Sequence, residues 1–390
     1  MSKPADSPRR PETTVVTAGR SPFDHHGLVN PPVYHASTML HPTMDALEQR
    51  AQPYTYGRRA TPTIRALENA ICALEGGAET VLCPSGLQAC TLALLSLASA
   101  GDHVLVTDTV YGPTRTFCDK TLSRFGVETT YYDPLIGGAI EHLFKPNTRA
   151  LFLESPGSLT FEVQDVPAMA AAAHARGISV ILDNTWATPL FFDALGHGAD
   201  LAVIAATKYV VGHSDAMLGT VTANEPHRKR LRETHGNLGL CVGPDDIYLG
   251  QRGLRTMAVR LKQHQATALR LAEWLRARPE VERVLYPALR DDPGHKIWKR
   301  DFKGASGLFA VELKPVPRTA VAAMLDHMKL FAMGWSWGGY ESLIVPALPM
   351  RTATNLNFNG PVLRIHAGLE AVEDLIADLE AGFDRLRKVA

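Results

Sequence analysis

Residues 178–215 read ISVILDNTWATPLFFDALGHGADLAVIAATKYVVGHSD, and this stretch decides the fold. It contains two short apolar runs, 178–183 and 201–205, separated by a polar and glycine-bearing segment. Short runs rich in Val, Ile and Leu and bounded by turn residues are typical of buried strands. Asp183 closes the first run, and Lys208 follows the second. The stretch therefore predicts two strands with a carboxylate and an amine at their carboxyl ends.

Similar apolar runs alternate with helical patterns from Glu79 onward. The other predicted strands are 80–83, 103–107, 128–132 and 150–154, and the predicted helices begin at Ser85, near 113–125 and over 166–176. Alternation at this spacing implies an α/β fold with a mainly parallel sheet covered by helices. The helix after Ser85 is apolar on nearly all sides, so we expect it to be buried.

The chain outside this unit has a different character. Residues 1–58 are rich in Pro, Thr and His and lack a sustained apolar period, which predicts an extended arm with a short helix at 43–50. A helix over 63–74 should follow, capped by Thr61 or Thr63 and stopped by Gly76-Gly77.

A long helical pattern over 246–276 leads into a second unit. This unit contains predicted strands at 307–313 and 362–366, a Gly- and Trp-rich loop at 334–339, and helices near 319–327 and 370–386. We therefore divide the chain into an N-terminal arm (1–58), a main domain (59–250) and a C-terminal domain (251–390).

The composition excludes several classes of partner. Forty Lys and Arg balance 40 Asp and Glu, so electrostatics give no reason to expect binding to nucleic acid or to an anionic membrane. The five cysteines form no Cys-x-x-Cys pair, which argues against a disulfide framework. No apolar run has the length of a membrane span, and residues 1–10 lack a signal-like apolar region. We expect a cytoplasmic protein that acts on or binds a small molecule, with no metal site.

The residues that follow the predicted strands carry the candidate chemistry, because ligands of open α/β sheets bind beyond the carboxyl ends of the strands. A buried Asp183 needs a cation or strong donors, and Lys208 in a partly apolar pocket can form a Schiff base. Alone, each has an ordinary explanation, a local salt bridge or a solvated lysine. Together they suggest pyridoxal 5′-phosphate (PLP), whose aldehyde binds an amine and whose ring nitrogen needs an acidic partner.

Two further features agree with this cofactor. Ser85-Gly86 at a helix start offers free backbone N–H groups to a phosphate, although an ordinary helix cap would look the same. The segment lacks the spacing of a dinucleotide-binding or P-loop motif. Tyr111 offers a flat face on which a ring can stack.

Six motifs, in order along most of the chain, resemble those of the PLP-dependent enzymes of Cys/Met metabolism. They are YGRRATPT (56–63), SGLQA (85–89), YGPT (111–114), DNTWATP (183–189), ATKYVVGHSD (206–215) and SWGGYES (336–342). The resemblance implies the aspartate-aminotransferase-like fold, fold type I of PLP-dependent transferases. It also implies a mainly parallel, seven-stranded type of sheet and a smaller α+β C-terminal domain.

The resemblance further implies roles for particular residues of the cofactor site. Lys208 corresponds to the lysine that binds the cofactor covalently and acts as general base, Asp183 to the partner of the ring nitrogen, and Tyr111 to the stacking tyrosine. The phosphate-binding positions correspond to Gly86, Leu87 and Thr207, and to Tyr56 and Arg58 from a neighbouring subunit. Sharing of this kind implies an oligomer, and a homotetramer is usual in the family. Many members have Ser where this chain has Ala205, so Thr207 and Arg58 would carry more of the phosphate contact.

The C-terminal unit should supply the substrate side of the site. By the same resemblance, Arg364 binds the α-carboxylate of an amino-acid substrate, and a planar guanidinium suits that group. Members that act at the γ-carbon usually read Asn-Pro-Thr and Ser-Leu-Gly-Gly, whereas this chain reads Thr61-Pro62-Thr63 and Ser336-Trp337-Gly338-Gly339. The second pair is similar to the β-lyases of the family.

The resemblance to the β-lyases implies a reaction. It is β-elimination of L-cystathionine to L-homocysteine, pyruvate and ammonia, with other S-substituted cysteines as further substrates. Ser336 and Trp337 would lie beside the substrate, and Tyr111 would assist proton transfer or only stack. Trp337 would alternatively only pack the domain interface.

Three alternatives stay open at this level. The first is cleavage or synthesis at the γ-carbon, as in cystathionine γ-lyase, cystathionine γ-synthase or methionine γ-lyase. The second is a serine hydrolase using Ser214, because GHSDA (212–216) resembles a nucleophile elbow, although Ala216 replaces the final glycine. The third is a PLP-binding protein without catalytic activity.

Overall fold

Seven strands form the main sheet of the structure, a computed structural model that describes residues 9–389. Their order is β1 (Glu79–Cys83), β7 (Gly219–Ala223), β6 (Leu201–Ile204), β5 (Ser179–Asp183), β4 (Thr148–Glu154), β2 (His103–Thr107) and β3 (Glu128–Tyr132). All run parallel except β7, which is antiparallel to both its neighbours. The predicted mainly parallel sheet is confirmed. Strand β7 was not predicted, because its alternating Thr-Val-Thr sequence contains no continuous apolar run.

Both faces of this sheet are buried. On β4, Ala150 and Phe152 belong to the apolar cluster that includes α4 (Gly86–Leu97), whereas Leu151 and Leu153 belong to the cluster that includes α6 (Val166–His174). Alternate residues of a strand point to opposite faces, so an apolar run marks a strand covered on both sides. The helix predicted near 113–125 is composed of α5 (Gly112–Thr116), a π-helical segment (Phe117–Leu122) and a 3-10 turn (Ser123–Phe125).

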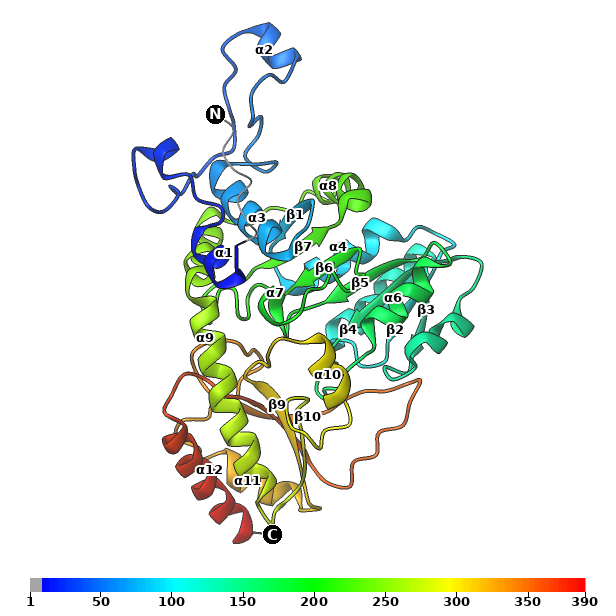
Figure 1. Cartoon of the computed structure of the whole chain (residues 1–390), viewed down its shortest axis with the longest axis vertical. Helices are drawn as coiled ribbons and strands as arrows, with labels where there is room; N and C mark the ends of the chain where they lie inside the picture. Colours follow the sequence, from blue (N-terminus) through cyan, green and yellow to red (C-terminus); the bar gives the residue numbers. More distant parts are fainter. Residues whose placement is uncertain (1–8, 390) are drawn as a thin grey trace.

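The N-terminal arm is only partly extended. Helix α1 (Pro11–Thr17), which was not predicted, packs against α3 (Pro62–Glu75) and α9 (Pro244–Arg276), and Arg255 donates hydrogen bonds to the carbonyls of Val15 at 2.8 Å and Ala18 at 2.9 Å. Between α1 and α3 the chain projects from the body of the molecule with η1 (Pro22–His25) and α2 (Met44–Glu48) (Figure 1). The part of the predicted arm before residue 9 lies outside the described residues.

Local caps set the bounds of α3, as predicted. The Thr61 hydroxyl accepts a hydrogen bond from Ile64 N at 3.2 Å, and Gly76 ends the helix with φ of 67°. A side-chain cap and a left-handed glycine satisfy the free backbone groups at the two ends of a helix. The predicted helix over 43–50 is the shorter α2, which is capped by Thr43.

The C-terminal unit is built on a second, antiparallel sheet. Its order is β10 (Leu343–Ala347), β11 (Val362–His366), β9 (Leu308–Leu313) and β8 (Val281–Leu285), with helices α11 (Arg318–Leu325) and α12 (Val372–Arg387) beside it. Strands β8 and β10 were not predicted. Helix α9 runs alongside both sheets (Figure 1). The boundary proposed at residue 250 lies inside this helix and stays a prediction.

The remaining elements connect these layers. They are η4 (Gly137–Leu143), α7 (Thr188–Phe191), η5 (Glu225–His227), α8 (Arg228–Asn237) and α10 (His295–Asp301). Within residues 9–389, no helix combines the length and the apolar character needed to cross a bilayer.

Candidate active site

Lys208 lies just beyond the carboxyl end of β6, beside a loop of the C-terminal unit. Its Nζ donates to Ser336 Oγ at 2.8 Å and lies 5.1 Å from the centre of the Trp337 ring. Gly338 adopts φ of 86°, and a Cβ there would lie 3.0 Å from the Lys208 Cα. Only glycine allows the loop to approach this closely. The structure therefore brings together Lys208, Ser336 and Trp337, and the predicted place of Ser336 and Trp337 beside the substrate stays a prediction.

The environment of Lys208 favours its neutral amine. Burial lowers the pKa of Lys208 to about 8, and the Arg364 cation adds to this effect, while Asp183 opposes it. The Ser336 hydroxyl is a neutral partner that does not restore the lost hydration of an ammonium group. A lysine with such a pKa is a nucleophile and a base near neutral pH.

Asp183 ends β5, the strand next to β6, and is buried. Its Oδ1 accepts hydrogen bonds from the Thr185 hydroxyl at 2.5 Å and from the Thr185 amide at 3.0 Å. Among residues 9–389, its Oδ2 accepts a hydrogen bond only from the thiol of Cys90, at 3.6 Å. Burial raises the pKa of Asp183, against the hydrogen bonds from Thr185. One oxygen of a buried carboxylate thus has a weak donor, and a cationic N–H would complete it.

Glu154 is a site residue that the sequence analysis missed. It ends β4, and its Cα is the register partner of Asp183. One carboxyl oxygen accepts the Tyr111 backbone N–H at 2.7 Å, and the other accepts the Ser158 hydroxyl. Burial and the neighbouring Asp183 carboxylate raise the pKa of Glu154. A carboxylate closing an apolar run beside the run that ends in Asp183 was the available signal.

Tyr111 follows β2, as predicted, and its backbone position is fixed by the hydrogen bond to Glu154. Its side chain keeps 43% of its surface exposed, so the ring has an open face on which a planar ligand can stack. Burial of the hydroxyl end raises the pKa of Tyr111, and the phenol therefore stays protonated near neutral pH.

The start of α4 has the properties of a phosphate site. Ser85 caps the helix by accepting Gln88 N at 3.1 Å, while the N–H groups of Gly86 and Leu87 have no acceptor within the helix. A Cβ on Gly86 would lie 2.4 Å from the Cβ of Ala205, so glycine is required for α4 to approach the segment that carries Lys208.

Thr207 has a structural partner. Its hydroxyl donates to Leu218 O at 3.1 Å and accepts from Leu218 N at 2.9 Å. These bonds hold the segment before Lys208 against Leu218, the residue that precedes β7. The predicted contact of Thr207 with the phosphate stays a prediction.

Tyr56 and Arg58 lie away from the Lys208 pocket of their own chain. Arg58 Nη1 donates to Gly236 O at 2.9 Å, and its guanidinium carbon lies 5.8 Å from the centre of the Tyr56 ring. Neither side chain hydrogen bonds to Lys208 or Asp183 in the described part of the chain. Their predicted contact with the phosphate in a neighbouring subunit stays a prediction.

Arg364 provides an uncompensated cation at the substrate side. It lies on β11 and is buried, with 8% of its surface exposed. It donates hydrogen bonds to Gly334 O at 3.1 Å and Ser336 O at 3.0 Å. Burial lowers the pKa of Arg364. Across residues 9–389, no carboxylate forms an ion pair with it. A buried guanidinium bound only to carbonyls is suited to bind a carboxylate from outside the protein.

Ser214 lacks the surroundings of a hydrolytic nucleophile. Its hydroxyl donates to Glu341 Oε1, and the adjacent His213 bonds to the Val211 carbonyl. Within the described chain, no imidazole is hydrogen bonded to the Ser214 hydroxyl, so the base that a hydrolase needs is not in place. The geometry does not support the serine hydrolase alternative.

The groups present fit PLP at each of its ends. An amine of lowered pKa, a buried carboxylate with a weakly satisfied oxygen, and free helix N–H groups meet the demands of the aldehyde, the ring nitrogen and the phosphate. On a seven-stranded sheet of this order, they define a PLP-dependent enzyme of fold type I.

Comparison with known proteins gives the family. The chain belongs to the Cys/Met metabolism PLP-dependent enzymes, whose family model matches residues 12–384. The predicted family and cofactor are confirmed.

Individual relatives match along nearly the whole chain. It is 46% identical to cystathionine beta-lyase MetC of Escherichia coli, over 96% of this chain and 98% of the relative. It is 41% identical to the L-alanine/L-glutamate racemase of Wolbachia pipientis wMel, over 96% and 97% of the two chains. The crystal structure of metB from Corynebacterium glutamicum superposes with a TM-score of 0.91 at 31% identity, covering 97% of this chain and 98% of the other. The predicted fold type is thereby confirmed.

Proposed function

We propose that this enzyme cleaves the Cβ–S bond of L-cystathionine to give L-homocysteine, pyruvate and ammonia, and that it also accepts other S-substituted cysteines. The contact of the Ser336-Trp337-Gly338 loop with Lys208 carries the proposal, because Trp337 lies 5.1 Å from the reacting amine. Trp337 distinguishes this loop from the Ser-Leu-Gly-Gly loop of the γ-acting members. The name of the 46% identical E. coli relative supports the same reaction.

The residues of the chain divide the work of this reaction. When bound, PLP supplies an electron sink for the pair left behind when a proton leaves the substrate Cα. Arg364 binds the α-carboxylate and so orients the Cα–H bond toward Lys208. Lys208, with a pKa of about 8, accepts the Cα proton as general base. Asp183 would hold the ring nitrogen of the bound cofactor, and its carboxylate would favour the protonated form of that nitrogen.

The leaving sulfur needs a proton, and Tyr111 is the candidate donor. Its phenol stays protonated because burial raises the pKa of Tyr111, and its backbone is held by Glu154. We propose that Tyr111 donates its proton to the departing thiolate in addition to stacking on the cofactor. The Trp337 ring lies 5.1 Å from the Lys208 amine, and we propose that it contacts the substrate there.

Identification of the products tests the proposal. Purified holoenzyme incubated with L-cystathionine should form equal amounts of pyruvate and homocysteine. Formation of 2-oxobutyrate and cysteine instead would show γ-cleavage. A parallel incubation with L-alanine tests the reaction named for the Wolbachia relative, which also begins with removal of the Cα proton. Rapid formation of D-alanine without cystathionine cleavage would replace the lyase proposal with a racemase.

We also propose a homotetramer in which Tyr56 and Arg58 reach the phosphate of a neighbouring subunit. The projecting part of the arm supports an intersubunit role, because Phe23 is 95% exposed and Leu40 is 85% exposed in the single chain. Light scattering gives the subunit number. Mixing inactive Arg58→Ala and Lys208→Ala chains should restore part of the activity, because some mixed sites receive both native residues. No restoration would contradict shared sites.

A reducing compartment suits the thiols of this chain. All five cysteines are free, and Cys83, Cys90 and Cys118 are buried. We therefore propose a cytoplasmic location, which fractionation of the source cells tests.

A further inference from the structure

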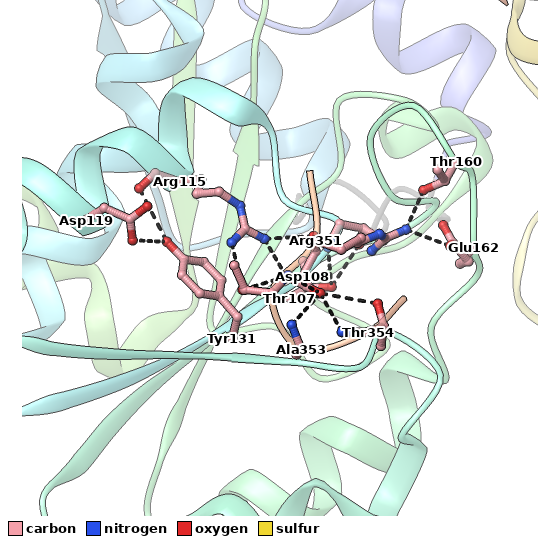
Figure 2. A network of polar contacts seen from close by, with 12 residues as sticks. Thr107, Asp108, Arg115, Asp119, Tyr131, Thr160, Glu162, Arg351, Ala353 and Thr354 are labelled. Atoms are coloured by element: carbon pink, nitrogen blue, oxygen red, sulfur yellow. Dashed lines mark hydrogen bonds and ion pairs between the residues drawn. The ribbon is translucent and has the colours of Figure 1, made fainter. Parts of the chain in front are cut away.

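The loop between β10 and β11 extends to the main domain, where its residues 352–354 bind one buried carboxylate. Asp108, which follows β2, accepts hydrogen bonds from the backbone N–H groups of Thr352 at 3.0 Å, Ala353 at 2.8 Å and Thr354 at 3.0 Å (Figure 2). The hydroxyls of Thr352 and Thr354 also donate to it. The Asp108 side chain has no exposed surface. Three consecutive amides converge on it, so the loop is fixed at this point.

Two arginines complete the same junction. Arg115 donates to Asp108 Oδ1 at 2.6 Å and to the Thr352 hydroxyl at 3.1 Å, and its guanidinium carbon lies 3.7 Å from the centre of the Tyr131 ring. Arg351 is the second arginine.

Arg351 ties the loop to a different segment of the main domain. It donates to the Thr160 hydroxyl and to Glu162 Oε1, each at 2.6 Å (Figure 2). Each arginine is therefore paired with a carboxylate, and the side chains of both arginines are almost fully buried. We call Asp108, Arg115, Arg351 and residues 352–354 the clasp.

The clasp joins the segment that carries Tyr111 to the loop that precedes the strand of Arg364. On the main-domain side, Asp108 precedes Tyr111 by three residues, and Thr109 O accepts Ser158 N at 2.9 Å. Ser158 in turn donates to Glu154, which holds Tyr111. On the other side, the fixed loop connects β10 to β11, and β11 carries Arg364.

We propose that Asp108 is a positioning residue for the substrate carboxylate. By holding the β10–β11 loop on the segment that carries Tyr111, Asp108 sets the position of Arg364 relative to Tyr111 and Lys208. The inference rests on the proposed role of Arg364 in binding the α-carboxylate. It predicts that loss of the clasp weakens binding of the amino acid while the cofactor stays bound to Lys208.

The negative charge of Asp108 is needed for this arrangement. Its two oxygens together receive the Arg115 guanidinium, three amides and two hydroxyls. An asparagine has one acceptor oxygen, and its NH₂ group would face donors that need an acceptor. Asp108→Asn therefore keeps the shape of the side chain but releases part of the loop and leaves Arg115 without its partner.

The test compares two ligands of the holoenzyme that differ in the carboxylate. Binding of L-alanine and of ethylamine is followed by the change in cofactor absorbance. In Asp108→Asn, affinity for L-alanine should fall by about ten-fold, as expected for loss of a charged hydrogen-bonding partner, while affinity for ethylamine stays unchanged. The KM for cystathionine should rise more than kcat falls. A variant with merely loosened folding would lose affinity for both ligands.

Asp119→Asn is the matched control. Asp119 accepts the Tyr131 hydroxyl at 2.7 Å in the same network but does not touch the β10–β11 loop (Figure 2). It should bind L-alanine as the wild type does. If Asp108→Asn yields no folded holoenzyme, Arg351→Gln carries the same test at the second tie of the loop.

Arg364→Lys separates the two ideas. If this variant binds L-alanine weakly while the clasp variants bind it as tightly as the wild type, the positioning role of Asp108 is overturned. If Arg364→Lys itself binds L-alanine normally, the proposed carboxylate site is at fault. Weak binding in both Arg364→Lys and Asp108→Asn, with ethylamine binding unchanged, supports the inference.

Discussion

The Lys208 pocket and the clasp both contain buried charged groups. The buried carboxylate of the clasp, Asp108, is fully hydrogen bonded, whereas the charged groups of the pocket are only partly hydrogen bonded. In the clasp, burial alone would raise the pKa of Asp108, yet hydrogen bonds from Thr352, Arg115 and the following amides hold it below its ordinary value. In the pocket, burial dominates: it lowers the pKa of Lys208 to about 8 and raises that of Asp183. The Asp108 carboxylate thus has strong hydrogen-bond donors on both oxygens, whereas one oxygen of the Asp183 carboxylate has only a weak donor.

This difference separates a fastening from a binding site. A buried charge whose hydrogen bonds are all made within the chain holds segments together. A cluster of buried groups whose charged forms are poorly satisfied can be completed by a ligand, and perturbed pKa values of this kind gather at active sites. Arg364, whose hydrogen bonds within the described residues go to two carbonyls only, belongs to the second kind. Substitutions of Lys208, Asp108, Asp183 and Glu75 test this distinction.

Replacement of Lys208 should have the largest effect. Lys208→Ala should lower pyruvate formation by at least about 10³-fold, because the general base and the covalent attachment of the cofactor are both lost. Steady-state assays measure the rate, and borohydride trapping measures the attachment. The exposed Lys262 on α9 provides the control, since Lys262→Ala should keep full activity. Turnover of Lys208→Ala within ten-fold of the wild type would remove this residue from the chemistry.

Asp108→Asn should have its main effect on stability. Breaking the buried pair with Arg115 should cost about 3 to 5 kcal/mol in the free energy of unfolding, measured by urea denaturation. Because the folded-state pKa of Asp108 is depressed, its contribution is present above its ordinary pKa of 3.8 and is lost as the pH falls through the lower folded value. The variant should lack this acid dependence. A variant as stable as the wild type at pH 7 would show that the clasp does not fasten the domains.

Asp183→Asn should reduce catalysis without unfolding the protein. The amide can keep the contact with Thr185 but carries no charge for the ring nitrogen. An opposite charge nearby shifts a pKa by about 1 to 3 units, so removal of the Cα proton should slow by about 10- to 10³-fold. Exchange of the Cα proton of L-alanine in deuterated water measures this step directly. An unchanged exchange rate would exclude the electrostatic role.

Glu75 sharpens the comparison because it is an unsatisfied buried carboxyl outside the pocket. Both its oxygens lack a hydrogen-bond partner in the described part of the chain, and burial, with Asp193 nearby, raises the pKa of Glu75 to about 8. Above its ordinary pKa of 4.5 the folded state therefore retains a proton that the unfolded chain releases, so stability falls as the pH rises from 4.5 to about 8.

Glu75→Gln should remove this dependence. We expect it to raise the free energy of unfolding at pH 9 by about 1 to 3 kcal/mol without changing kcat, because the neutral amide avoids burying the charge that the wild-type carboxylate carries at this pH. Glu233→Gln, at an exposed position on α8, is the control. Loss of activity in Glu75→Gln would instead place this carboxyl in the machinery of the enzyme.

Local signals in the sequence predicted the elements that depend on local structure. The caps at Thr61 and Gly76 gave α3, and the long apolar period gave α9 nearly to the residue. Helix α1 was missed because it is held by a contact distant in sequence, the hydrogen bonds from Arg255. Strand β7 was missed because burial in the sheet, and not its own composition, makes it a strand.

From the sequence we could infer the chemistry of this protein, because Asp183 ends one predicted strand, Lys208 follows the next, and the carboxyl ends of parallel strands meet at one edge of the sheet. The tertiary structure alone decided what surrounds them. Glu154 beside Asp183, Ser336 on the Lys208 amine and the clasp that joins two domains all depend on contacts between segments far apart in the chain. The spacing of residues along the chain does not show which distant segments meet, because these contacts form only when the two sheets pack together.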